Sequence, residues 1–322
     1  MKVLVTGGAG FIGSNLVDAL IDRGDDVVVL DNLTTGRLSN IDPAIARGAK
    51  LVVEDIRERK LVASLLEAEK PDVVFHLAAQ IDVRVSTAQP DFDAGINVVG
   101  TINMLEAARH TGTKRFIYAS TGGAIYGETD VVPTPEDTVI QPEAPYGQAK
   151  FAGEGYLGLW KRMHDLSTVS LRFGNVYGPR QDPLGEAGVI AIFCGKLETG
   201  GQPTVFGDGR QTRDYIYVED VVRACLLAAG SDVSGSYNVG RGEEVSVLQL
   251  VEALRDLGAE LGMLEGDRTF AAQFAPARLG EVQRSALDPT RSRDKLGFTA
   301  EVELSDGLRR TLQFVAREQA AA

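Results

Sequence analysis

Apolar runs of strand length alternate with helix-length segments through the first half of the chain, and this alternation restricts the fold more than any other feature. Six runs have the length and composition of buried strands: KVLVTG, DVVVLD, KLVVED, PDVVFHLAA, KRFIYAS and STVSLRF. Helical patterns lie between them, among them SNLVDALIDRG, RKLVASLLEAEK, VVGTINMLEAARHTG and YGQAKFAGEGYLGLWKRMHD. Strands that alternate with helices form right-handed βαβ units, so the sequence predicts an α/β fold with a doubly wound parallel sheet.

The regular alternation ends after Arg172. Gly- and Pro-rich stretches such as GPRQDPLGEAG and ETGGQPTVFGDGRQTRD follow, and they indicate loops of a smaller, mixed α/β portion. We therefore expect a cofactor-binding sheet domain over residues 1–172 and a smaller substrate lobe over 173–322. The chain is expected to return to the sheet domain around 214–240.

A glycine-rich turn follows the first predicted strand directly. The stretch TGGAGFIG places Gly7, Gly10 and Gly13 at a G-x-x-G-x-x-G spacing, and a helical pattern comes next. Glycine there permits a tight turn and the close approach of a pyrophosphate, which the helix N-terminus can bind through free N–H groups. The second strand ends in Asp31, 18 residues after Gly13. A carboxylate there accepts hydrogen bonds from the adenosine ribose and repels a 2′-phosphate, so we predict a Rossmann domain that binds NAD rather than NADP.

Other residues near the carboxyl ends of the strands are candidates for the same cofactor. The third strand ends at Asp55 and Ile56, and the fourth ends in the small residues of the LAA stretch, across which a cofactor can lie. The full set of expected cofactor contacts is Gly7, Gly10, Phe11, Ile12, Gly13, Asp31, Asn32, Thr35, Gly36, Asp55, Ile56, Leu77, Ala78, Ala79, Gln80, Asn97, Tyr146 and Lys150.

The stretch PYGQAK places Tyr146 and Lys150 four residues apart, on one face of a predicted helix. A tyrosine normally titrates near pH 10. A neighbouring ammonium favours the phenolate and can make the tyrosine a general base. The same spacing also occurs in surface helices by chance, so its meaning depends on the glycine turn upstream.

Composition excludes several classes of function. A net charge of −12 argues against bulk binding to nucleic acid or to anionic membranes. No apolar window approaches the length of a membrane span, and the N-terminus lacks the features of a signal peptide. Cys194 and Cys225 and the three histidines are scattered rather than placed at metal-ligand spacing. We expect a cytoplasmic protein without a metal site.

The motifs together resemble the extended short-chain dehydrogenase/reductases and, within them, the UDP-glucose (UDP-galactose) 4-epimerases. The resemblance covers nearly the whole chain, in the family's order: TGGAGFIGSNLVDAL, DNLTTG, HLAAQIDVRVS, NVVGT, PYGQAK, RFGNVYGPRQ, FGDGRQTRDYIYVEDV, YNVGRG and RLGEVQRSALDP. TGxxGxxG with YxxxK is specific for the superfamily, and RDYIYVEDV for the branch that acts on nucleotide sugars.

The resemblance implies a mechanism. Tyr146 takes the proton from the sugar O4 while hydride passes from C4 to NAD, and a transient 4-keto sugar turns its other face before the hydride returns. Lys150 lowers the pKa of the tyrosine and holds the nicotinamide ribose, and a Ser or Thr hydrogen-bonds the 4-hydroxyl. NAD is thus a recycled hydride carrier, and UDP-galactose and UDP-glucose are interconverted.

The resemblance also implies a substrate site in the C-terminal lobe, because guanidinium groups bind pyrophosphate oxygens bidentately. Ser285 occupies the position that gates sugar size, and a small residue there leaves room for an N-acetyl group, so UDP-GlcNAc and UDP-GalNAc remain alternative substrates. Gly188 and Val189 stand where better-known members carry an Asn-Leu pair, so their contact can only be through the backbone. The expected substrate contacts are Thr121, Asn175, Gly188, Val189, Arg213, Arg278 and Glu281.

Three other functions share parts of this pattern. A nucleotide-sugar 4,6-dehydratase needs an Asp-Glu pair directly after the catalytic Thr, where this chain has Gly122 and Gly123. A UDP-glucuronate epimerase needs an additional arginine, and the GPRQDPLGEAG loop supplies only Arg180. A non-catalytic NAD-sensing regulator would not need the tyrosine and lysine, and both are present.

The catalytic hydroxyl depends on how YASTGGAIYG is aligned with the family. Alignment from the Tyr-Gly end puts Gly122 at the hydroxyl position, whereas alignment from the strand RFIYAS puts Thr121 there. A buried strand fixes register and a Gly-Gly loop absorbs an insertion, so we predict Thr121, with Ser120 as the alternative. By resemblance the protein is a homodimer formed through the NVVGTINMLEAARH and YGQAKFAGEGYLGLW segments.

Overall fold

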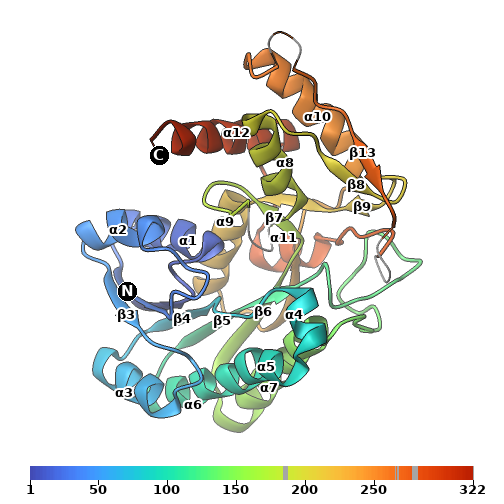
Figure 1. Cartoon of the computed structure of the whole chain (residues 1–322). Coiled ribbons are helices and arrows are strands. Elements are labelled where there is room, and N and C mark those ends of the chain that lie inside the picture. The colour runs from blue at the N-terminus through green and yellow to red at the C-terminus, as the bar shows by residue number, and fades with distance from the viewer. Residues whose placement is uncertain (184–187, 265, 267, 278–281, 322) are drawn as a thin grey trace.

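A seven-stranded parallel sheet forms the centre of the larger part of the molecule (Figure 1). The structure is a computed structural model that describes residues 1–183, 188–264, 266, 268–277 and 282–321. The strand order is β11-β6-β5-β4-β1-β2-β3, and every neighbouring pair is parallel. The strands are β1 (Lys2–Thr6), β2 (Asp26–Asp31), β3 (Lys50–Val53), β4 (Val73–His76), β5 (Arg115–Thr121), β6 (Ser167–Phe173) and β11 (Gly235–Val239).

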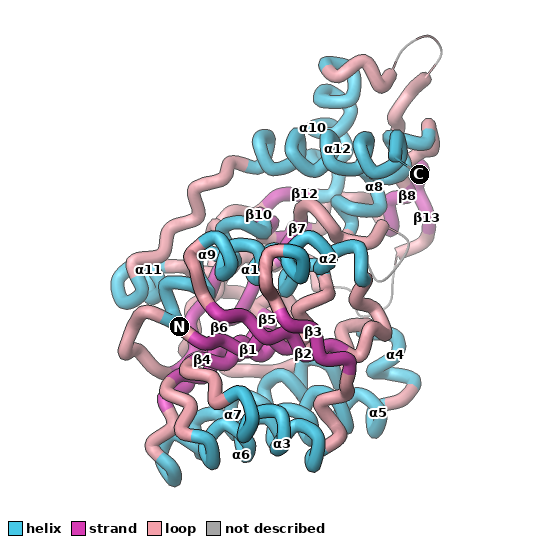
Figure 2. The backbone as a smooth tube through the Cα atoms, turned by 90° about the vertical axis from the view of Figure 1, so that its left-hand side faces the viewer, coloured by secondary structure: helices cyan, strands magenta, loops and turns pink. Residues whose placement is uncertain are grey.

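Helices cover both faces of the sheet (Figure 2). One face carries α1 (Phe11–Asp22), α2 (Leu38–Ala46) and α9 (Val218–Ala229). The other carries α3 (Arg59–Glu69), α6 (Thr101–Thr111) and α7 (Pro145–His164). The short helices α4 (Val83–Ala88) and α5 (Pro90–Ala94) precede α6, and α11 (Thr290–Leu296) packs against α9 and β11. The prediction of a doubly wound parallel α/β sheet is confirmed.

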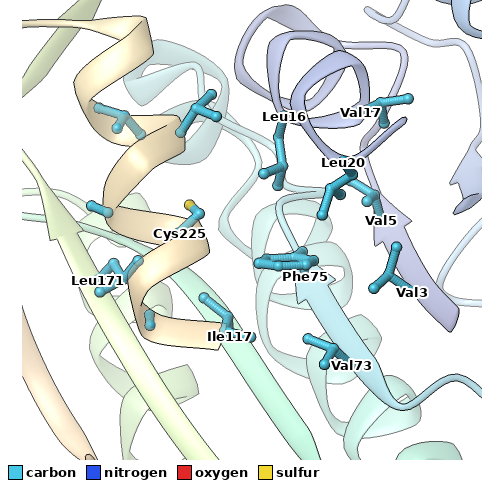
Figure 3. Packing of buried hydrophobic residues seen from close by; sticks show 14 of the residues in the cluster. Val3, Val5, Leu16, Val17, Leu20, Val73, Phe75, Ile117, Leu171 and Cys225 are labelled. Carbon is cyan, nitrogen blue, oxygen red and sulfur yellow. The ribbon is translucent and has the colours of Figure 1, made fainter. Parts of the chain in front are cut away.

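The alternation of side chains along each strand fills one core on each face of the sheet. Val3 and Val5 of β1 point toward α1, where they join Leu16, Leu20 and Phe75 (Figure 3). The residue between them, Leu4, belongs to the core under α3 and α6 on the opposite face. Strands buried on both faces require the near-continuous apolar runs seen in the sequence.

The C-terminal lobe has a hydrophobic core of its own, which includes Phe193, Leu197, Leu250 and Leu308. Three two-stranded ladders pair β7 with β10, β9 with β12 and β8 with β13. The strands are β7 (Asn175–Tyr177), β8 (Thr204–Phe206), β9 (Thr212–Arg213), β10 (Tyr215–Tyr217), β12 (Val245–Ser246) and β13 (Gln273–Ala275). The helices are α8 (Val189–Thr199), α10 (Val247–Glu260) and α12 (Leu304–Ala321). Among the described helices, none combines the length and the apolarity that crossing a bilayer requires.

The start of α6 differs from the predicted helix that begins at Val98. A six-residue π-helix, η1 (Gly95–Gly100), joins α5 to α6 and carries Asn97. Short π-helical segments inside helices are rare and occur often at functional sites. The hydrophobic pattern could not reveal this π-helical turn. The turn precedes α6, so it does not change the spacing of the apolar residues within α6.

Candidate active site

The glycine turn between β1 and α1 has no room for larger residues. Gly7 has a φ of +70°, and a Cβ there would lie 2.7 Å from the backbone N of Ala78. A Cβ on Gly13 would lie 2.1 Å from the carbonyl O of Gly7. No described side chain caps the N-terminus of α1, and the first turn contains no acidic residue. The turn therefore presents backbone N–H groups and the positive end of a helix dipole, as phosphate binding requires.

Asp31 is the last residue of β2, and its carboxylate is fixed by the loops around it. Oδ2 accepts a hydrogen bond from the N–H of Ala9 (2.9 Å), and Oδ1 accepts one from the N–H of Leu33 (2.8 Å). The side chain of Asn32 donates to Oδ2 of Asp55 (2.9 Å) at the end of the neighbouring strand. A hydrogen bond from Arg57 lowers the pKa of Asp55 to about 2. Two carboxylates thus lie at the carboxyl ends of β2 and β3.

A buried histidine at the end of β4 helps to fix the segment that follows this strand. His76 hydrogen-bonds Thr6 (2.7 Å) and Thr101 (3.0 Å), and burial lowers its pKa to about 3, so it is neutral. The hydroxyl of Thr6 also accepts a hydrogen bond from the N–H of Ala78 (3.1 Å). The small residues that follow β4 are therefore fixed directly against the glycine turn, between β1 and β4. The order of strands reverses at this point, where ligands of open α/β sheets bind.

Tyr146 and Thr121 meet at the carboxyl end of β5. Thr121 is the last residue of β5, Tyr146 lies in the first turn of α7, and the Thr121 hydroxyl lies close enough to Tyr146 to favour its phenolate. Burial raises the pKa of Tyr146 to about 12, and the neighbouring Thr121 hydroxyl opposes this rise. In the ligand-free chain the tyrosine is therefore protonated at neutral pH.

Lys150 lies one turn further along α7, with 2% of its surface exposed. Its ammonium donates to the carbonyl O of Ala119 (2.9 Å) and lies 4.8 Å from the ring centroid of Tyr118. Burial lowers the pKa of Lys150 to about 8. In the ligand-free chain the Lys150 ammonium is turned toward β5, and burial dominates the pKa of Tyr146. That Lys150 lowers the pKa of Tyr146 therefore stays a prediction for the complex with cofactor.

Ser120 belongs to a different hydrogen-bond network from Thr121. Its hydroxyl donates to Oε1 of Glu154 (2.7 Å), and Ser236 donates to Oε2 of the same carboxylate (2.9 Å). Arg172 completes the network with an ion pair to Glu154 of 2.6 Å and a hydrogen bond to the Tyr126 hydroxyl of 2.8 Å. Alternate residues of β5 thus point to opposite faces, which separates the two hydroxyls.

The two glycines after Thr121 lie against the substrate side of the sheet. A Cβ on Gly122 would lie 2.4 Å from the Leu287 side chain, so an acid at this position would require Leu287 to move. A Cβ on Gly123 would lie 3.5 Å from Oδ1 of Asn175. That oxygen is buried and has no hydrogen-bond partner among the described residues. A buried acceptor without a donor is costly and suits a ligand that brings one.

The remaining predicted substrate residues lie in the C-terminal lobe. Gly188 caps the N-terminus of α8, and Val189 is its first residue. Arg213 lies in β9 and donates to the carbonyl groups of Thr212 (2.8 Å) and Val282 (2.9 Å). The other two, Arg278 and Glu281, lie outside the described residues.

Sequence reasoning missed two buried acids next to the site, Asp93 and Glu154. Asp93 precedes Asn97 by four residues and accepts a hydrogen bond from its side chain (3.0 Å). Glu154 follows Lys150 by four residues on α7. Each acid lies four residues from a predicted site residue on a helix, and this spacing could have indicated it. Surface helices carry acids at the same spacing, so the pattern is not specific.

The sequence and the fold are similar to those of known nucleotide-sugar enzymes. Residues 4–311 match the profile of a family described as GDP-mannose 4,6 dehydratase. The chain is 44% identical over 316 residues to the UDP-glucose 4-epimerase of Mycolicibacterium smegmatis, covering 98% of each.

Two solved structures have nearly the same fold. A UDP-glucose 4-epimerase from Thermotoga maritima, crystallised with UDP-glucose, has a TM-score of 0.94 at 42% identity over 99% of this chain and 100% of that one. A UDP-glucose 4-epimerase from Thermus thermophilus, in complex with NAD, has a TM-score of 0.89 at 40% identity over 98% of this chain and 99% of that one.

Proposed function

This chain belongs to the extended short-chain dehydrogenase/reductase family, in the branch of GDP-mannose 4,6-dehydratase and the UDP-glucose 4-epimerases, and we propose that it interconverts UDP-galactose and UDP-glucose with NAD as cofactor. The observation that carries the proposal is the placement of Thr121 beside Tyr146, with Lys150 one turn away, at the same sheet edge as the glycine turn. The glycines after Thr121 support epimerisation over dehydration, since neither can transfer a proton.

The residues at this edge fit NAD. The amides of the first turn of α1 would hold its pyrophosphate, and the fixed carboxylate of Asp31 would accept hydrogen bonds from the adenosine ribose. Ala78 and Lys150 would border the nicotinamide half. When bound, NAD supplies reversible hydride transfer at C4 of the sugar.

Tyr146 moves the proton at the sugar O4 in this proposal. Thr121 would hydrogen-bond the same hydroxyl and orient it toward the tyrosine. Tyr146 releases its proton near pH 12 without ligands, so positive charge from Lys150 and from the oxidised cofactor has to favour the phenolate in the complex. Asn175, Arg213 and Arg278 would contact the nucleotide diphosphate. Gly188 and Val189 at the start of α8 would contact the nucleotide through the backbone, and Glu281 would lie near its ribose.

We expect the substitution Asp31→Ala to weaken NAD binding about ten- to a hundredfold, because it removes charge-assisted hydrogen bonds to the ribose. Isothermal titration of NAD into the cofactor-free protein measures the effect. Asp26→Ala is the matched control, because Asp26 is the exposed first residue of the same strand. Equal affinities in the two variants would remove Asp31 from the cofactor site.

Thr121 and Ser120 are distinguished by a second pair of variants. Thr121→Val keeps the shape and removes the hydroxyl, and we expect it to lower kcat about a hundredfold, as the loss of one donor at a reacting oxygen does. Ser120→Ala leaves Glu154 with one donor fewer and should mainly lower stability, by about 1 to 3 kcal/mol. Turnover rates and urea unfolding together separate these effects, and the reverse pattern would make Ser120 the catalytic hydroxyl.

The substrate itself is tested by incubating the purified protein with UDP-galactose, UDP-GalNAc and dTDP-glucose in separate reactions. We expect the 4-epimer of UDP-galactose. Faster turnover of UDP-GalNAc would assign the N-acetylated alternative that the small Ser285 allows, and a 4-keto-6-deoxy product would establish a dehydratase. No turnover of any substrate would overturn the epimerase proposal.

The proposal extends to a cytoplasmic homodimer formed through α6 and α7. Val99, just before α6, and Phe151, on α7, are 51% and 38% exposed, as an interface of that kind would require. Light scattering of the purified protein measures the assembly, and a monomer would contradict this part.

A further inference from the structure

Asp93 is a buried carboxylate next to the catalytic pair, and no motif in the sequence accounts for it. The residue is 0% exposed. Its Oδ1 accepts hydrogen bonds from Nε2 of Gln80 (2.8 Å) and Nδ2 of Asn97 (3.0 Å). Its Oδ2 has no hydrogen-bond partner among the described residues. A buried carboxylate with one bare oxygen is costly unless a nearby positive charge compensates it.

The compensating charge lies on the helix that packs against α5. α5 contacts α7 (Figure 1). The Asp93 carboxylate and the Lys150 ammonium on α7 attract each other electrostatically. The π-helix that follows α5 places Asn97 over the same carboxylate. Burial raises the pKa of Asp93, whereas the two amide donors and Lys150 oppose this rise and favour the ionised form.

The other titratable groups around Lys150 are neutral or already compensated. From β4, His76 is neutral because burial lowers its pKa to about 3. Burial raises the pKa of Tyr118 on β5 and of Tyr146 on α7, so both keep their protons. Glu154 on α7 is ion-paired with Arg172 and accepts two further hydrogen bonds.

Among the described residues that act on Lys150, Asp93 is therefore the carboxylate whose charge no arginine neutralises. We propose that Asp93 is a positioning residue, whose charge keeps Lys150 an ammonium at neutral pH and whose hydrogen bonds hold Gln80 and Asn97 in the cofactor site. Its importance for turnover rests on the proposed function, because that function requires a cation beside Tyr146.

The sign of the effect follows from two opposing interactions. Burial disfavours the charged lysine, and Asp93 favours it. When the Asp93 charge is removed, its favourable effect on the charged lysine is lost while the effect of burial remains. Lys150 therefore loses its proton at a lower pH. The alkaline limb of the activity profile then moves toward neutral pH, while activity at pH 6 changes less.

The substitution Asp93→Asn tests the proposal, because the amide keeps the size of the side chain and can accept both hydrogen bonds through Oδ1. The first readout is a pH titration of lysine 13Cε signals by NMR in the ligand-free protein, with Lys150 assigned from Lys150→Met. The wild-type midpoint should lie near 8, and Asp93→Asn should lower it by about one to three pH units. The control Asp91→Asn, an exposed acid on the same helix, should leave it unchanged.

The second readout is the pH profile of kcat/KM, whose alkaline limb should shift in the same direction in Asp93→Asn. If that variant unfolds, Asp93→Ser removes the charge within a smaller side chain and is titrated in the same way. Equal Lys150 midpoints in the wild type and in the folded variant would overturn the proposal. An inactive wild type would instead overturn the proposed function, and the NMR comparison, which uses no substrate, would still decide the role of Asp93.

Discussion

Tyr146→Phe is expected to lower kcat by about a hundred- to ten-thousandfold, which is the range that proton transfer by a positioned side chain contributes. The variant loses only the phenolic hydroxyl, so the ring still fills its place at the start of α7. Thr121 would keep its position at the end of β5 and could still hydrogen-bond the sugar. We therefore expect KM for UDP-galactose and the affinity for NAD to change little while kcat collapses.

The matched control is Tyr156→Phe, ten residues further along the same helix. Tyr156 packs edge-on against Trp160 at 5.9 Å between ring centroids, away from Thr121. This variant should retain the wild-type kcat. Initial rates at saturating UDP-galactose measure both variants, and full activity of Tyr146→Phe would remove the tyrosine from the mechanism.

Arg172→Met is expected to lower the free energy of unfolding by about 3 to 5 kcal/mol, because it leaves a buried carboxylate without its cation. The Arg172 and Glu154 side chains are only 5% and 6% exposed, and their ion pair joins β6 to α7. Arg172 also donates to the Tyr126 hydroxyl (2.8 Å) and to the carbonyl O of Glu136 (3.1 Å), which hold the loop after Thr121. Activity should fall with stability, since that loop borders the catalytic hydroxyl.

Arg309→Met provides the control for an exposed pair of similar geometry. Arg309 contacts both oxygens of Glu260 at 2.9 and 2.7 Å, but the two side chains are 34% and 59% exposed. Exposed ion pairs contribute little to stability, so its unfolding curve should overlay that of the wild type. Urea denaturation compares the variants, and a stable Arg172→Met protein would mean that Glu154 finds another partner or takes up a proton.

The sheet and the cofactor edge were predictable because each depends on local sequence. A strand buried on both faces must be apolar throughout. A turn that brings Gly7 against Ala78 excludes any side chain at that position. Both requirements are therefore visible in the amino-acid sequence. Strand register also predicts Thr121 rather than Ser120 as the catalytic hydroxyl, and this stays a prediction; in the structure Ser120 donates to Glu154 and Thr121 lies beside Tyr146.

The electrostatics of the site could not be predicted in the same way. Whether Lys150 acts on Tyr146 depends on the direction of a flexible side chain, and in the ligand-free chain its ammonium points to the carbonyl O of Ala119. The burial of Asp93 depends on a π-helical turn that leaves no periodic signal. Pairings between a helix and a strand, such as Glu154 with Arg172, join residues 18 positions apart through tertiary packing alone.

The most direct test of the account is a proton NMR spectrum of UDP-galactose in D2O with the purified protein and no added reductant. The account predicts that the signals of UDP-glucose appear and that C4 of the product carries hydrogen, because a hydride does not exchange with solvent. Deuterium at C4, or UDP-galactose that remains unchanged, would contradict it.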